Sequence, residues 1–99
     1  MVTLVVYDVA DNRERQKVER VCRDKGLSRV QYSVFRGSVG REARQALVRS
    51  LTALARKNPA ETWDVQIYFI SAEDFPAHVR LKAGGPVADL EKIERLTIV

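Results

Sequence analysis

The feature that most constrains the fold is a run of strand-forming residues near the start of the chain. Residues 3–7 read Thr-Leu-Val-Val-Tyr, and such β-branched and aromatic residues favour a β-strand. Apolar side chains stand at both odd and even positions of the run, so we expect both faces of this strand to be covered. The run therefore predicts a central strand of a sheet, and Asp8 ends it.

A helix is predicted directly after this strand. Asp11 and Glu14 have the spacing of a capping box, with aspartate in place of the usual serine or threonine. Gly26 is a plausible end of the helix, because glycine adopts the left-handed conformation of many helix ends. The narrow apolar stripe that would face the core consists of Val18, Val21 and Cys22.

The rest of the chain alternates between strand and helix patterns. Residues 29–35 are strand-like and extend toward Val39, either as one bent strand or as a tight hairpin, since Gly37 and Gly40 permit both. Apolar residues at helical spacing predict a second helix over residues 41–57, which Asn58 and Pro59 end. Residues 63–70 form a further strand with alternating faces, and residues 94–99 are a candidate terminal strand.

This order of elements predicts an α+β fold in one domain that spans residues 1–99. The simplest arrangement is a ferredoxin-like sandwich, with two helices on one face of a mostly antiparallel sheet. A domain of 99 residues has a thin core. A partner subunit would add burial, so an oligomer is consistent with the length.

Charge and cysteine content narrow the class of function. The net charge is +4 and arginine is abundant in the first third of the chain, which suits contact with phosphate groups. The alternative is an ordinary surface of mixed charge, because 13 acidic residues are also present. Cys22 is the single cysteine, and no apolar run approaches the roughly 20 residues of a membrane span. We expect a cytoplasmic protein with no membrane partner.

Asp8 is the sharpest candidate for chemistry, because its carboxylate leaves the sheet where the apolar stripe of Leu4 and Val6 stops. A single carboxylate is a poor Mg²⁺ site, since this ion takes six oxygen ligands. A two-fold axis near the strand end would bring together Asp8 of two subunits, and water and a phosphate would complete the shell. The alternative is an aspartate that only forms a turn.

Four further residues are candidates for contact with nucleic acid. Arg15, Lys17 and Arg29 could bind the phosphate backbone, or they could belong to a solvated surface. Phe35 could stack on a base, but the end of an apolar strand favours packing in the core.

Two segments together resemble a known family. They are Val-Val-Tyr-Asp-Val at residues 5–9, followed by a basic helix, and Arg-Val-Gln-Tyr-Ser-Val-Phe at residues 29–35. They resemble the small CRISPR-associated adaptation nuclease, the second protein of the Cas set and the partner of the Cas integrase. A weaker match is Asp-Val-Gln-Ile-Tyr at residues 64–68, because the family often has an acidic residue before an Ile-Tyr strand.

The resemblance implies a ferredoxin-like homodimer in which the terminal strand, residues 94–99, extends the partner's sheet. It implies that Asp8 binds Mg²⁺ or Mn²⁺, one aspartate coming from each subunit. It also implies that Arg15, Lys17 and Arg29 contact nucleic acid and that Phe35 is the aromatic residue of the site. Lys17 stands where arginine is common, and Arg36 stands where glutamate is common.

Two classes of function follow from the resemblance. One is a subunit of spacer acquisition that binds duplex DNA and bridges the integrase. The other is a magnesium-dependent endonuclease that cleaves RNA or DNA. The first is favoured as the biological role, because the sequence offers one acid per chain and no evident general base. A toxin-type endoribonuclease of the same fold outside CRISPR is the alternative.

Overall fold

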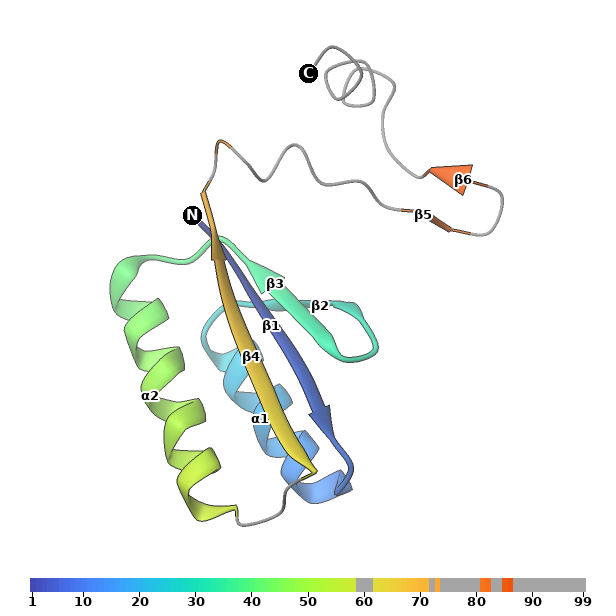
Figure 1. Cartoon of the computed structure of the whole chain (residues 1–99). Coiled ribbons are helices and arrows are strands. Elements are labelled where there is room, and N and C mark those ends of the chain that lie inside the picture. The colour runs from blue at the N-terminus through green and yellow to red at the C-terminus, as the bar shows by residue number, and fades with distance from the viewer. Residues whose placement is uncertain (59–61, 72, 74–80, 83–84, 87–99) are drawn as a thin grey trace.

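The computed structural model describes residues 1–58, 62–71, 73, 81–82 and 85–86. Its elements are β1 (Val2–Val9), α1 (Asn12–Asp24), β2 (Ser28–Gln31), β3 (Val34–Gly37), α2 (Arg41–Lys57), β4 (Trp63–Ile70), β5 (Leu81–Lys82) and β6 (Gly85–Pro86). The first four strands form an antiparallel sheet in the order β2-β3-β1-β4, and both helices cover one face of it (Figure 1). This is the predicted ferredoxin-like arrangement. The strands β5 and β6 pair with each other, and the predicted terminal strand lies outside the described residues.

The central strand β1 buries only one of its faces among the described residues. Thr3, Val5, Tyr7 and Val9 are buried, whereas the alternate positions are half-buried as far as Val6, and Asp8 is exposed. The expectation that both faces are covered is therefore wrong for the described residues: only the face toward the helices is covered, because α1 and α2 lie on the same side of the sheet (Figure 1). The other side is an apolar surface that ends at Asp8.

Helix α1 begins and ends where the sequence predicts. The Asp11 carboxylate accepts a hydrogen bond from the Glu14 backbone N–H at 3.0 Å, which satisfies one donor of the first turn. At the other end Gly26 has a φ of 93°. The Leu27 N–H donates across it to the Cys22 carbonyl at 3.0 Å, the pattern that closes a helix through a left-handed glycine.

Residues 28–37 form a hairpin, which settles the choice that the sequence left open. The turn is Tyr32-Ser33, between β2 and β3, and neither Gly37 nor Gly40 takes part in it. Outside glycine, no described residue has a positive φ, so the turn does not need a glycine. A bulge between Arg29 and Gln31 takes up the extra residue of β2.

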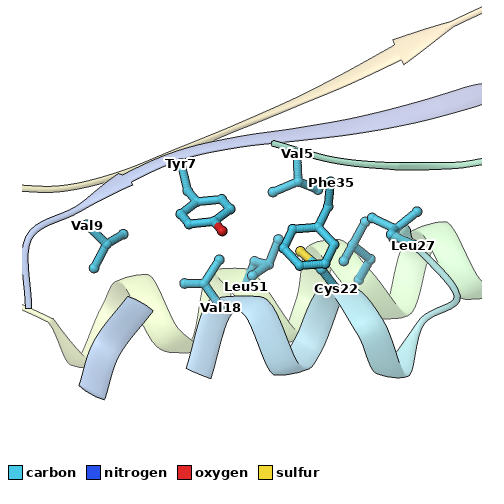
Figure 2. Packing of buried hydrophobic residues seen from close by; sticks show 9 residues of the cluster. Val5, Tyr7, Val9, Val18, Cys22, Leu27, Phe35 and Leu51 are labelled. Atoms are coloured by element: carbon cyan, nitrogen blue, oxygen red, sulfur yellow. The ribbon is translucent and has the colours of Figure 1, made fainter. Parts of the chain in front are cut away.

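The core lies between the sheet and the helices. Strand β4 and helix α2 have the predicted bounds, and α2 contributes Leu47 and Leu51 to the buried cluster. Figure 2 shows the Tyr7 and Phe35 side chains directed from the sheet toward the helices, with ring centroids 6.1 Å apart. Packing along β1 thus fixes the strand whose last residues form the site.

Candidate metal and nucleic-acid site

A hollow of about 480 Å³ lies at the end of β1. Asp8 is exposed in it, so the aspartate singled out from the sequence faces open space and not the core. The hollow also receives residues from α1, from the β2–β3 turn and from β4. Its lining consists of Val6, Tyr7, Asp8, Val9, Ala10, Arg15, Tyr32, Ser33, Asp64 and Gln66.

A second carboxylate faces Asp8 across the sheet. The antiparallel register of β1 and β4 pairs Asp8 directly with Asp64, and directly opposed residues of such a pair point to the same face. Both side chains are exposed and line the hollow. The sequence analysis counted one acid per chain, so the structure corrects that count to two at this site.

The donor chemistry of this pair fits a hard divalent cation. Mg²⁺ and Mn²⁺ prefer oxygen ligands, and Mg²⁺ is commonly bound by one or two carboxylates together with water and phosphate oxygens. No group of three or more His, Cys, Asp or Glu side chains gathers for a metal among the described residues. A metal site built on Asp8 and Asp64 would therefore be an open one, with positions left for water and substrate.

Arg15 is the cation of the hollow. Its guanidinium donates to the Asn12 side-chain oxygen one turn earlier on α1 and lies 5.8 Å from the centre of the Tyr32 ring. These contacts hold a half-buried arginine beside the two carboxylates. Lys17 is in a different position, since it does not line the hollow and its ammonium pairs with Glu14 at 2.9 Å.

Arg29 and Phe35 lie behind the hollow and not inside it. Arg29 pairs with Glu19 at 2.8 Å, and its guanidinium lies 5.4 Å from the centre of the Phe35 ring. Phe35 is fully buried, so its ring packs in the core and is not presented to a base in this structure. The exposed aromatic residue of the hollow is Tyr32, whose exposed fraction is 71%.

Tyr7 connects the core with the hollow. Its hydroxyl donates to the Glu19 carboxylate at 2.7 Å. Burial raises the pKa of Tyr7, and the hydrogen bond to Glu19 raises it further. The phenol, which is protonated at neutral pH even without this shift, thus also keeps its proton in more alkaline solution and acts as a hydrogen-bond donor.

Comparison with known proteins shows the family to which this chain belongs. The model of the family "CRISPR associated protein Cas2" matches residues 1–77. This chain belongs to the Cas2 family of CRISPR-associated proteins. All candidate site residues, Asp64 included, lie in the matched part, which agrees with the resemblance seen in the sequence.

Three relatives show how far the similarity to individual Cas2 proteins extends. "CRISPR-associated endoribonuclease Cas2 2" of Chloroflexus aurantiacus is 37% identical over 73 residues, which are 74% of this chain and 82% of the relative. "CRISPR-associated endoribonuclease Cas2" of Korarchaeum cryptofilum is 31% identical over 81 residues, 82% of this chain and 84% of the relative. "CRISPR-associated endoribonuclease Cas2 1" of Archaeoglobus fulgidus is 39% identical over 56 residues, 57% and 60% of the two chains.

The sequence of this Cas2 chain pointed to Asp8, offered Asp64 only as part of a weaker family match, and gave no sign of the role of Glu19. Asp64 stands at the start of a strand, and only the pairing register places it opposite Asp8. Glu19 was missed because a glutamate on a basic helix is read as a solvent-exposed residue.

In the described part of the chain, no helix has the length and apolar character of a membrane span.

Proposed function

We propose that this Cas2-family chain is a divalent-metal-dependent endoribonuclease whose site is the hollow at Asp8. The observation that supports this proposal most is the pairing of two exposed carboxylates, Asp8 and Asp64, in one hollow. Two relatives that align with 74% and 82% of this chain, at 37% and 31% identity, are named endoribonucleases. The toxin-type alternative outside CRISPR is dropped, since the family assignment gives no reason to retain it.

Each side chain of the hollow has a distinct role in this proposal. Asp8 and Asp64 would bind Mg²⁺ or Mn²⁺, and the chemistry that such an ion supplies is polarisation of the phosphate and activation of water. Arg15 would orient the phosphate from the side of α1, because guanidinium binds phosphate oxygens in a bidentate manner. The exposed Tyr32 ring would stack on an unpaired base, the usual way in which proteins hold single-stranded RNA.

The test is cleavage of a single-stranded RNA by isosteric variants in the presence of Mg²⁺ or Mn²⁺. Asp8→Asn should lower the cleavage rate at least about a hundredfold, and Asp64→Asn should lower it at least about tenfold. Asp24→Asn is the matched control, because this exposed aspartate ends α1 away from the hollow. Equal cleavage by wild type and Asp8→Asn would remove Asp8 from the reaction.

We also propose that the chain acts as a homodimer through the open face of the sheet. That face presents half-buried Leu4, Val6 and Val34, and Tyr68 with 48% of its surface exposed. A second subunit on this face would bury apolar side chains and bring a second Asp8 toward the first. Leu4→Glu should therefore halve the mass measured by sedimentation while the far-ultraviolet circular dichroism stays unchanged. A wild-type monomer at micromolar concentration would refute the dimer.

We propose that the chain has a second role in spacer acquisition, in which it binds duplex DNA and bridges the integrase. The net charge of +4 and the exposed Arg13 and Arg20 of α1 support contact with the DNA backbone. Acquisition of new spacers in cells separates this role from cleavage. Asp8→Asn should acquire spacers normally if binding is the role, whereas Arg13→Glu combined with Arg20→Glu should not. Loss of acquisition in Asp8→Asn alone would show that acquisition needs the cleavage site.

A further inference from the structure

Glu19 is a buried carboxylate that the proposed reaction does not use. It lies on α1 with 8% of its surface exposed, facing the sheet. One of its oxygens, Oε2, accepts a hydrogen bond from the Tyr7 hydroxyl at 2.7 Å and forms an ion pair with Arg29 Nη2 at 2.8 Å. A buried carboxylate is strongly unfavourable without such partners. Glu19 therefore needs both of its neighbours, one from β1 and one from β2.

The same two neighbours also contact the β2–β3 turn. Arg29 Nη1 donates to the Tyr32 carbonyl at 3.3 Å, and the Tyr7 hydroxyl oxygen lies 3.0 Å from that carbonyl oxygen. The Tyr7 backbone N–H donates to the Ser33 carbonyl at 3.0 Å. Since Tyr7, Tyr32 and Ser33 line the hollow beside Asp8, these bonds fix one wall of the site.

The Arg29 guanidinium is already occupied by these contacts. Its positive charge is paired with Glu19, its other terminal nitrogen donates to a carbonyl, and its Cζ atom lies 5.4 Å from the centre of the buried Phe35 ring. The Arg29 side chain is 39% exposed, so its contacts and not its burial hold it in place. If it moved away to a phosphate, the buried Glu19 charge would be left unpaired, which is strongly unfavourable. Arg15, in contrast, lines the hollow itself.

We propose that Glu19, Tyr7 and Arg29 form a positioning network that holds the Tyr32-Ser33 turn beside Asp8, and that Arg29 acts through this turn and not by contact with phosphate. None of the three residues is a catalytic residue in this scheme. The effect of the network on cleavage rests on the proposed endoribonuclease function. Its effect on the turn does not.

Glu19→Gln is the decisive variant for the site. Glutamine has the same shape but no charge, and a buried acid cannot contact an anionic substrate, so a loss of rate in a protein that remains fully folded must come from the position of the turn. We expect the rate at saturating RNA to fall about tenfold, while RNA affinity is equal to or higher than that of wild type. Glu42→Gln, at an exposed glutamate in the first turn of α2, is the matched control and should cleave normally.

Arg29 variants separate positioning from phosphate contact. Lysine keeps a charge that can bind phosphate but lacks the planar fork that reaches Glu19 and a carbonyl together. We expect Arg29→Lys to lose as much cleavage rate as Arg29→Gln. The salt dependence of RNA binding should stay the same in both. A slope of log K against log[salt] that falls by about 0.7 in Arg29→Gln, the value for one lost phosphate contact on a single strand, would overturn the proposal.

Hydrogen exchange tests the network without any activity. The Tyr7 amide, which donates to the turn, should exchange about tenfold faster in Glu19→Gln and Arg29→Lys than in wild type. The Leu51 amide in α2 reports general loss of stability and should not change by that factor. Unchanged Tyr7 protection in both variants refutes the network, even if the wild type does not cleave RNA. If the Tyr7 amide loses protection in both variants but both cleave RNA normally, the network does not position the site for cleavage.

Discussion

Two like charges that face each other in a sheet should make the metal-free protein less stable than it could be. Asp8 and Asp64 are directly opposite each other on β1 and β4, and the Cβ atoms of such pairs are about 5 Å apart. For carboxylates at a similar separation, two unit charges in water repel by about 0.8 kcal/mol. Screening at physiological salt, where the Debye length is about 8 Å, reduces this to about 0.4 kcal/mol.

We therefore expect Asp64→Asn to raise the free energy of unfolding by about 0.4 to 0.8 kcal/mol in buffer with EDTA. The increase should be largest at low salt and should shrink as NaCl is added. Asp8→Asn should give a similar increase, since either change removes the same repulsion. In the double variant the two increases should not add. In this double-mutant cycle, the difference between the sum of the two single increases and the increase of the double variant measures the interaction between the carboxylates.

Divalent cation should reverse the order of stability. An ion that binds only the folded protein stabilises it by RT ln(1 + [L]/Kd), about 1.4 kcal/mol at ten times Kd. Mg²⁺ should add this amount to wild type and much less to Asp64→Asn, so the wild type becomes the more stable protein.

Urea unfolding at one fixed protein concentration, with and without Mg²⁺, measures both effects. Asp24→Asn is again the control and should show neither. If Asp64→Asn is no more stable than wild type in EDTA and responds to Mg²⁺ as wild type does, the two carboxylates do not form a site.

Three predictions concern the fold. Burial raises the pKa of the Cys22 thiol to about 12, above the roughly 8.5 of a free thiol. The unfolded chain thus loses this proton first, and the free energy of unfolding should fall by about 1.4 kcal/mol per pH unit once the pH exceeds about 9. Cys22→Ala should not show this slope in urea titrations between about pH 9 and 10, below the range in which the raised pKa of Tyr7 also contributes. Gly37→Ala should lower stability by about 1–3 kcal/mol, because the new Cβ would lie 2.7 Å from Leu27 Cδ2 and 3.1 Å from a backbone oxygen; an unchanged urea midpoint would contradict the packing. Asp11→Ala should cost about 1 kcal/mol by removing the hydrogen bond to the Glu14 N–H, and equal thermal midpoints would show that this cap is not needed.

The sequence predicted the elements whose signals are local. Helix α2 and strand β4 have the expected bounds because apolar periodicity and the stop at Asn58 suffice to define them. The start of α1 at Asp11 and its end at Gly26 agree for the same reason, since capping involves residues only a few positions apart. The turn at Tyr32-Ser33 could not be placed, because it contains no glycine or proline and its two strands read as one run.

The features that the sequence could not give depend on contacts between distant residues. Asp64 faces Asp8 only through the register of β1 and β4, which the packing of the whole sheet sets. The burial of Glu19 depends on Tyr7 and Arg29 reaching it from two strands. A family motif can include Arg29 without saying what it touches, and the structure shows that this partly exposed side chain is paired with the buried Glu19 carboxylate.

The alternation of β1 explains why one short strand can provide both a core and a site. Its odd residues, such as Val5 and Tyr7, are buried under the helices, whereas its even residues reach the opposite face and end at exposed Asp8. A change at Asp8 therefore leaves the core packing intact, and loss of cleavage in Asp8→Asn would report on chemistry. A change at Tyr7 removes a buried hydrogen bond and alters the turn at once, so lost activity there has two causes. Variants at Asp8 therefore test the chemistry of the protein without a change in the core. Variants at buried positions such as Tyr7 test how the site is held in place.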